Sequence, residues 1–365
     1  QIAQELDARY VIEGRVRKSG NRIRLTAQLV DGGLGKDIWA ERYDRELEDI
    51  FALQDELTLA IVGAVEPAMG QAEQDRAKRK PPENLDAWES YQQGMSFYYK
   101  RTEEGFWAAR RLFQHAISID PQFALAYAGL ARNYYYNVLF GTMEGDAEEA
   151  EKAALKAIDL DPDEAEAHLA LGNVYSANRE FDRAIPEFET AISLNPGYAS
   201  AYHRLATAVI HIGRAEEALP HLLTAIRLSP KDGEIALFHA RLALAHLFLR
   251  QHAEAVEWAR KAIRLPGIQW PGHCFLVASL AHLDEMAEAQ IALERLLLFR
   301  PGITASFVQD HFPTSIGENL DHLVDGLRKA GLPEEYALHI KSRMGWCRQR
   351  TLNVALWHES DIAAG

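Results

Sequence analysis

The fold is decided by the sequence AISIDP at residues 116–121, which recurs as AIDLDP at 157–162, AISLNP at 191–196 and AIRLSP at 225–230. Each copy follows a stretch rich in alanine and leucine. Its proline stands where a helix must stop, because proline has no backbone N–H to continue the hydrogen-bond ladder. The last three prolines are spaced by 34 residues. Self-similarity at such a period indicates an array of stacked helix pairs.

A period of 34 residues is that of the tetratricopeptide repeat. Small residues recur 12 positions before each stop, where the two helices of a pair would cross closely. They are Ala109, Ala150, Ala184, Ala218, Ala255 and Ala289. The last two stops are Gly267 and Pro301, so the sequence predicts six helix pairs over residues 87–310.

The regions on either side of the array have different patterns. Apolar and polar residues alternate over residues 9–43 in three runs, and Ser19-Gly20-Asn21 is typical of a hairpin turn between the first two. A helical apolar stripe follows Asp49 and ends or kinks at Pro67. We therefore predict a mostly α protein, a helix-pair superhelix preceded by a small truncated α/β domain. The predicted boundaries are an α/β domain at 1–75, a linker at 76–86, a capping helix within 311–335 and a tail at 336–365.

Composition excludes several classes of protein. The 365 residues carry a formal net charge of −14, which argues against nucleic acid as a partner of this chain. No run approaches the roughly 18 apolar residues that span a bilayer, so no membrane segment is predicted. Cys274 and Cys347 are far apart and lack the spacing of a metal site. A cytoplasmic, reducing location fits this cysteine usage best.

Four stretches carry a resemblance to a bacterial family: YVIEGRVRKSGNR at 10–22, TAQL at 26–29, WAERYDR at 39–45 and DIFALQDE at 49–56. They resemble the TolB-like domain that precedes tetratricopeptide repeats in multidomain signalling proteins. The match continues through KPPENLDAW at 80–88 and GLRKAGLPE at 326–334. The resemblance implies an output module upstream, most often a class III adenylate or guanylate cyclase and sometimes a winged-helix DNA-binding domain. It also implies that Gln1 lies part-way into the TolB-like domain.

No catalytic residue is predicted in this chain. A class III cyclase needs two metal-binding aspartates and an Asn/Arg pair, and no segment has that pattern. His239, His246 and His252 are spaced by seven and six residues, but no carboxylate or cysteine at a helical spacing completes a metal site. Neither a metal nor another cofactor is expected.

Candidate binding residues come from the first helix of each pair, because these helices line the concave face of such arrays. The positions predicted to face the groove are Tyr91, Tyr98, Tyr99, Arg132, Tyr135, Tyr136, Asn173, His203, Thr207 and His211. Further along, the groove positions become mostly apolar: Leu244, Leu247, Phe248, Cys274, Ala278 and His282. Tyrosine suits the gripping of a peptide or helix, because it combines apolar area with a hydroxyl at low rotamer cost. Packing between neighbouring helices is the competing interpretation for these tyrosines.

Arg132, beside Asn173 one repeat later, could bind a carboxylate bidentately or form an internal hydrogen bond. The sequence therefore favours a non-catalytic, regulatory region that binds a protein or peptide. Two alternatives remain open. The chain could be a structural element that forms homo-oligomers, or the sensor arm of a winged-helix regulator.

Overall fold

Three antiparallel strands begin the part of the chain that the structure describes: β1 (Tyr10–Ser19), β2 (Arg22–Asp31) and β3 (Lys36–Glu46), in the order β1-β2-β3. The structure is a computed structural model. It describes residues 8–46, 57–58, 61, 63–65, 68–70, 72–74, 86–100, 102–140, 146–230, 232, 234–265, 270–312, 314 and 316–335, with backbone only at 135–140 and 146. The three predicted strands and the turn at Gly20, whose φ is +58°, are confirmed.

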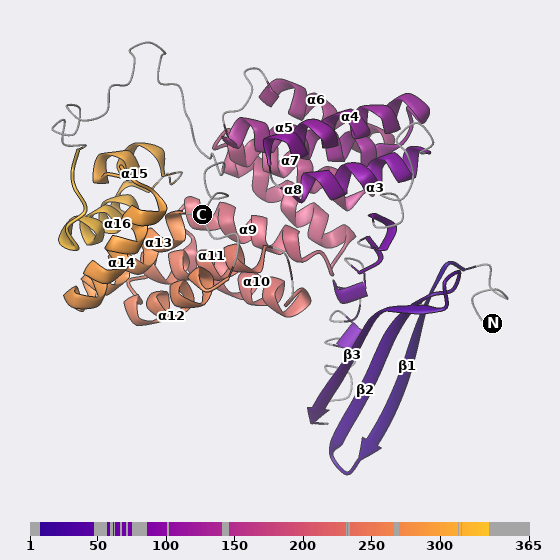
Figure 1. Ribbon diagram of the computed structural model, residues 1–365, viewed down its shortest axis with the longest axis horizontal. Coiled ribbons are helices and arrows are strands. Elements are labelled where there is room, and N and C mark those ends of the chain that lie inside the picture. Colours follow the sequence, from indigo (N-terminus) through magenta and orange to yellow (C-terminus); the bar gives the residue numbers. More distant parts are fainter. Residues whose placement is uncertain are drawn as a thin grey trace, which may run out of the picture.

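The sheet forms a blade that projects away from the helices (Figure 1). Ala27 and Leu29, on the apolar face predicted for the second strand, are buried. Glu73 joins the sheet to the array: one carboxylate oxygen accepts a hydrogen bond from the hydroxyl of Tyr10, and the other accepts one from the indole N–H of Trp88 at 3.2 Å. Arg9 adds an ion pair with Glu73 at 3.0 Å. This single buried carboxylate therefore anchors the sheet.

The described residues between 57 and 74 are helical, in agreement with the predicted stripe. Gly63 lies against the array, since a Cβ there would be 2.8 Å from the carbonyl oxygen of Leu228. Of the predicted linker at 76–86, only Asp86 lies within the described residues. Its carboxylate accepts from the backbone N–H of Glu89 at 2.8 Å, and the Glu89 carboxylate accepts from the backbone N–H of Asp86, which forms a capping box. The predicted tail at 336–365 lies outside the described residues.

Six helix pairs follow in the described part of the chain. They are α3 (Ala87–Tyr98) with α4 (Glu103–Ile119), α5 (Ala124–Phe140) with α6 (Asp146–Leu160), α7 (Ala165–Ala177) with α8 (Phe181–Leu194), α9 (Ala199–His211) with α10 (Ala215–Leu228), α11 (Ile235–Phe248) with α12 (His252–Ile263), and α13 (Trp270–His282) with α14 (Met286–Phe299). Two more helices end the described chain: α15 (Ala305–His311) and α16 (Gly317–Lys329). Figure 1 shows the pairs stacked side by side along the chain.

The core runs through the whole array. The six small residues that recur in the sequence, from Ala109 to Ala289, are all buried on the second helices of their pairs. They let each second helix approach its partner closely. Each first helix also packs against the next first helix, as α5 does against α7 and α11 against α13. The first helices therefore form a continuous inner layer, and the predicted mostly helical, repeat-type fold is confirmed.

Candidate functional site

A buried polar network crosses the inner layer in its amino-terminal half. Arg132 on α5 donates to Glu166 on α7, with 2.5 Å between Nη1 and Oε1, and both residues are 8% exposed. Tyr198, just before α9, donates its hydroxyl to the other oxygen of Glu166. The guanidinium carbon of Arg132 lies 4.9 Å from the ring centre of Tyr98 on α3. Four consecutive helix pairs are thus linked through one ion pair.

Electrostatics fixes the protonation of this network. Burial, and then the neighbouring Glu166 carboxylate, raise the pKa of Tyr198, so its hydroxyl remains a hydrogen-bond donor. Burial alone would lower the pKa of Arg132, but Glu166 together with Tyr98, Tyr198 and Tyr99 outweighs it, and the pKa is raised. Arg132 therefore stays charged, and it meets a carboxylate of its own chain.

The other predicted groove residues in the first pairs have mixed surroundings. Tyr91 packs within the core against Trp88, Phe113 and Phe123, with ring centres 5.6 to 5.9 Å away. Tyr99 is 51% exposed, so its ring is available to a partner. The side chains of Tyr135 and Tyr136 lie outside the described residues.

In the middle pairs, Asn173, His203 and His211 are buried. The ring of His203 lies 4.7 Å from that of Phe238. Thr207 is half-buried, and its hydroxyl donates to the backbone carbonyl of His203 at 2.9 Å. Among the ten groove residues predicted between Tyr91 and His211, Tyr99 is exposed and Thr207 is half-buried, whereas the others with described side chains are buried.

The carboxyl-terminal half of the inner layer is covered by the chain itself. Phe312 is buried, with ring centres 6.0, 6.4 and 5.9 Å from His211 on α9, Phe248 on α11 and Phe275 on α13. The Thr314 hydroxyl donates to the backbone carbonyl of His211 at 3.3 Å. Phe312 and Thr314 therefore lie along the first helices of the last three pairs.

Close packing continues beyond Thr314. Gly213 has a φ of +86°, and a Cβ there would approach Ile316 to 2.9 Å. Helix α16 then packs on α13 and α11, and at Gly326 an added Cβ would lie 2.8 Å from the Ala278 backbone. We refer to the described residues 312, 314 and 316–329 as the return segment.

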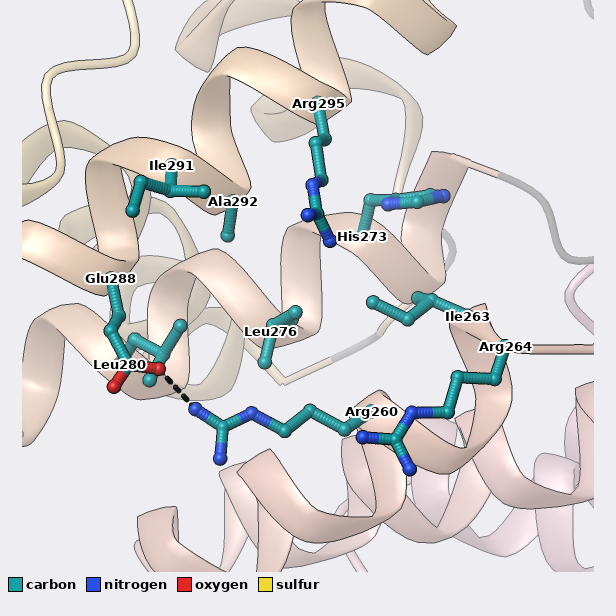
Figure 2. A pocket seen from close by; sticks show the side chains of 10 residues that line it. All are labelled: Arg260, Ile263, Arg264, His273, Leu276, Leu280, Glu288, Ile291, Ala292 and Arg295. Carbon is teal, nitrogen blue, oxygen red and sulfur yellow. Dashed lines mark hydrogen bonds and ion pairs between the residues drawn. The ribbon is translucent and has the colours of Figure 1, made fainter.

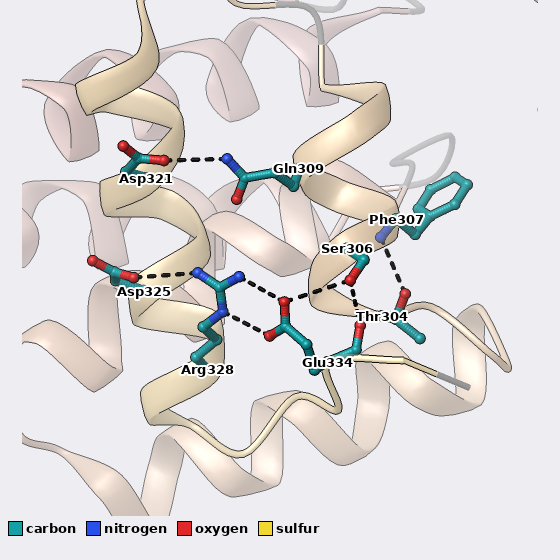
Figure 3. Close-up of polar contacts among 8 residues, drawn as sticks. All are labelled: Thr304, Ser306, Phe307, Gln309, Asp321, Asp325, Arg328 and Glu334. Carbon is teal, nitrogen blue, oxygen red and sulfur yellow. Dashed lines mark hydrogen bonds and ion pairs between the residues drawn. The ribbon is translucent and has the colours of Figure 1, made fainter. Parts of the chain in front are cut away.

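Polar contacts close the return segment against α15 (Figure 3). Arg328 donates to both carboxylate oxygens of Glu334, at 2.7 and 2.8 Å. The Ser306 hydroxyl donates to the backbone carbonyl of Glu334 at 2.7 Å, and Gln309 donates to Asp321 at 3.1 Å. These contacts hold α15, α16 and the end of the described chain as one unit.

The return segment accounts for the apolar later groove positions. Leu244, Leu247, Phe248, Cys274 and Ala278 are all buried. The thiol of Cys274 is fully buried, which raises its pKa and keeps it protonated and unreactive. The sequence signals were the apolar trend of these positions and the capping helix predicted within 311–335. The sequence does not show that the capping helix packs on these positions; only the path of the chain in the structure does.

We expect Ile316→Asp to loosen the return segment, because it places a charge against Gly213, just after the end of α9. The expected loss is roughly 1–3 kcal/mol of unfolding free energy. Hydrogen exchange should become faster over residues 316–329 and stay unchanged in α3 to α7. The control is Leu298→Asp, at a residue that is 82% exposed. Unchanged exchange in α16 would contradict the assigned role of residue 316.

A hollow of about 360 Å³ lies between α12, α13 and α14 (Figure 2). Its apolar part is formed by Ile263, Leu276, Leu280, Ile291 and Ala292, and its polar rim by Arg260, Arg264, His273, Glu288 and Arg295. Arg260 forms an ion pair with Glu288. Arg264 and Arg295 have no ion-pair partner within the described part of the chain. The hollow can accept an apolar group that carries a carboxylate.

A cluster of three histidines lies where the return segment meets the array. His252 on α12, His282 on α13 and His322 on α16 each place one ring nitrogen within 4.8 Å of the others. Burial, and then the neighbouring His282, Arg250 and His252, lower the pKa of His322 to about 3, so its ring is neutral. Sequence spacing did not indicate this group, because its members come from three helices.

A tetratricopeptide repeat family pattern matches residues 169–233, and a second one matches residues 237–267. Among curated proteins, the chain is 36% identical over 187 residues to "Putative adenylate cyclase 3" of Rhizobium meliloti (strain 1021). That match covers 50% of this chain and 32% of the relative. The chain therefore spans about a third of that relative's length.

Two solved structures have similar folds. The structure of the APC/C hetero-tetramer Cut9-Hcn1 matches with a TM-score of 0.54 and 20% identity, over 74% of this chain and 48% of that one. The human IFIT1 dimer with m7Gppp-AAAA matches with a TM-score of 0.51 and 15% identity, over 70% and 60%. At such identities the likeness concerns the fold alone.

The fold is of the tetratricopeptide type. Arrays of this type generally act as scaffolds for protein interactions, because stacked pairs offer an extended concave surface. Within the described residues, none of the helices combines the length and the apolar character needed to cross a membrane.

Proposed function

We propose that this chain is the non-catalytic, protein-binding and regulatory region of a bacterial signalling protein resembling class III adenylate or guanylate cyclases. The observation that carries the proposal is the match to an adenylate cyclase relative, combined with an array fold that suits binding. The TolB-like resemblance of residues 10–56 supports the same assignment. In this proposal the catalytic module belongs to the parent protein, and the array controls it.

The partner is a peptide or a helix bound on the inner face, and the amino-terminal half is the accessible part. The proposed groove comprises Tyr91, Tyr98, Tyr99, Arg132, Tyr135, Tyr136, Asn173, His203, Thr207 and His211. Tyr99 and Thr207 supply direct contacts, because their side chains are exposed and half-buried. Buried members such as Arg132 hold the first helices in position. The return segment already occupies the other half of this face.

The sequence that precedes Gln1 in the parent gene tests the assignment. A cyclase domain there leads to a second assay, cyclic nucleotide formation by the full parent protein with and without Tyr99→Ala. A change in rate supports regulation by the array. A winged-helix domain, or no further domain, would overturn the cyclase assignment and favour the sensor-arm alternative.

We expect Tyr99→Ala to lower the affinity for peptides that bind the groove by roughly tenfold, since an aromatic anchor commonly contributes more than 1 kcal/mol of binding free energy. Peptides are selected from a random library against the whole chain, and their affinities are measured by fluorescence anisotropy. Leu298→Ala is the control, because Leu298 is exposed on α14, away from the first helices. Peptides that lose affinity in Arg264→Ala but not in Tyr99→Ala would place the binding surface at the hollow of Figure 2 instead.

One observation favours a second function, assembly through the sheet. Ile12 and Val16 on β1 are 52% and 65% exposed and share one face of an edge strand. An edge of this kind can pair with another chain. Sedimentation over a range of concentrations separates the two functions: a monomer favours peptide binding, and a dimer that Val16→Lys dissociates favours assembly.

A further inference from the structure

Three imidazoles from three separate helices converge at the edge of the array. His252 begins α12, His282 ends α13, and His322 lies in the middle of α16. The Nε2 atoms of His252 and His322 are 2.9 Å apart. The rings of His282 and His322 are parallel, with centres 3.8 Å apart. All three residues are half-buried, so an ion from solvent can reach them.

The spacing suits a metal ion after small rotations of the side chains. Zinc binds histidine nitrogens at about 2.0–2.1 Å in tetrahedral geometry, which places two ligand nitrogens roughly 3.3 Å apart. The His252 and His322 nitrogens need to separate by only a few tenths of an ångström. The remaining distances, all within 4.8 Å, need to shorten. Rotation about the side-chain bonds of His282 supplies this change.

Hydrogen bonding prepares His282 for the role of ligand. Its Nε2 lies 2.9 Å from the backbone carbonyl oxygen of His322, and this contact requires that Nε2 carry the proton. The lone pair is then on Nδ1. Histidines that bind metals usually donate their other ring N–H to a carbonyl or carboxylate in this way. The Nε2 atoms of His252 and His322 lie within hydrogen-bond distance, so one proton lies between them. A metal ion can replace that proton.

The charges around the cluster are few. Arg250 is the cation that acts on His252 and His322, and its guanidinium donates to the backbone carbonyl of Glu318 at 3.4 Å. The Glu318 side chain acts on Arg250 with the opposite charge. Neutral imidazoles without a thiolate or a carboxylate are ligands that suit zinc, copper and nickel.

The geometry points to a transition-metal site formed by His252, His282 and His322, with Zn²⁺ as its occupant and a fourth position open to water. Because His322 belongs to the return segment and the other two ligands belong to the array, the ion joins α16 to α12 and α13. Binding of the metal then fixes the return segment over the inner face of the last pairs. Nothing in the pattern of the sequence alone assigns this role to these residues.

The test uses the whole chain without a histidine tag, after treatment with a chelator. Isothermal titration with Zn²⁺ should give one saturable site that is lost, or weakened at least about tenfold, in His252→Ala and in His322→Ala. His246→Ala should bind as the parent chain does, because His246 pairs with Gln251 outside the cluster. A hundredfold excess of Zn²⁺ over its dissociation constant should raise the melting temperature by about 5 °C.

Hydrogen exchange measures the proposed link directly. Zn²⁺ should slow exchange over residues 316–329 in the parent chain and in His246→Ala, but not in His252→Ala, whose substitution lies on another helix. Circular dichroism of the metal-free variants establishes that they are folded. The proposal is overturned if the parent chain has no saturable site in the micromolar range. It is also overturned if His322→Ala and His252→Ala bind as many ions as the parent, with the same affinity.

Discussion

Replacing Arg132 with methionine is expected to lower the free energy of unfolding by about 3–5 kcal/mol, because the Glu166 carboxylate would remain buried without its counter-ion. Both side chains are only 10% exposed, and the ion pair joins α5 to α7. Tyr198 would still donate to Glu166, but a neutral hydroxyl does not compensate for a buried charge. Denaturation by urea, followed by circular dichroism, measures the loss.

A double-mutant cycle separates the ion pair from the packing of the two side chains. Glu166→Leu alone should lower the free energy of unfolding by a similar amount to Arg132→Met, since it leaves the Arg132 guanidinium buried and without its counter-ion. The double variant Arg132→Met/Glu166→Leu should cost less than either single variant, because no charge remains to be desolvated. Lys152→Met is the matched control: its ion pair with Glu148 is exposed and should change stability very little. Equal losses in Arg132→Met and Lys152→Met would contradict the buried network.

Phe188→Ala is expected to lower the free energy of unfolding by about 3–5 kcal/mol, as is usual for the removal of a buried aromatic ring. Phe188 on α8 is fully buried and lies directly beneath Gly172 on α7. The cavity cannot collapse easily, because the two helices are held by the neighbouring pairs on either side. The same urea measurement applies, and a loss below 1 kcal/mol would show that the array closes around the missing ring.

The contact between Gly172 and Phe188 gives a matched test of this packing. A Cβ at Gly172 would lie 2.5 Å from Cε1 of Phe188, so Gly172→Ala should destabilise the chain by roughly 1–3 kcal/mol despite the better helix propensity of alanine. Gly172→Ala/Phe188→Leu should cost less than the sum of the two single changes, because the smaller side chain makes room for the methyl group. Gly317→Ala is the control, since nothing lies within 4 Å of a Cβ at that position of α16.

The repeat period does not predict this network. Arg132 and Glu166 are 34 residues apart, but the stops Pro121 and Pro162 of these two pairs are 41 residues apart. The equivalent of Arg132 on α7 is therefore Asn173, which the sequence interpretation considered and which is buried on the same helix as Glu166. Glu166 lies seven residues, about two helical turns, before that position. The exposed position of Tyr99 carried no sequence signal either.

The sequence by itself determined the helix pairs, their stops and their buried alanines, as well as the three-stranded sheet with its turn at Gly20. These features depend on residues close together in the chain or one period apart, whose local preferences and spacing fix hydrogen bonds and crossings directly. Only the tertiary structure decided that Phe312 lies on α9, α11 and α13, and that His252, His282 and His322 meet. The contacts of Phe312 and His322 with the array join residues 37 to 101 positions apart, through a segment outside the repeat. Its direction depends on the packing of whole helices, and no periodic pattern encodes it.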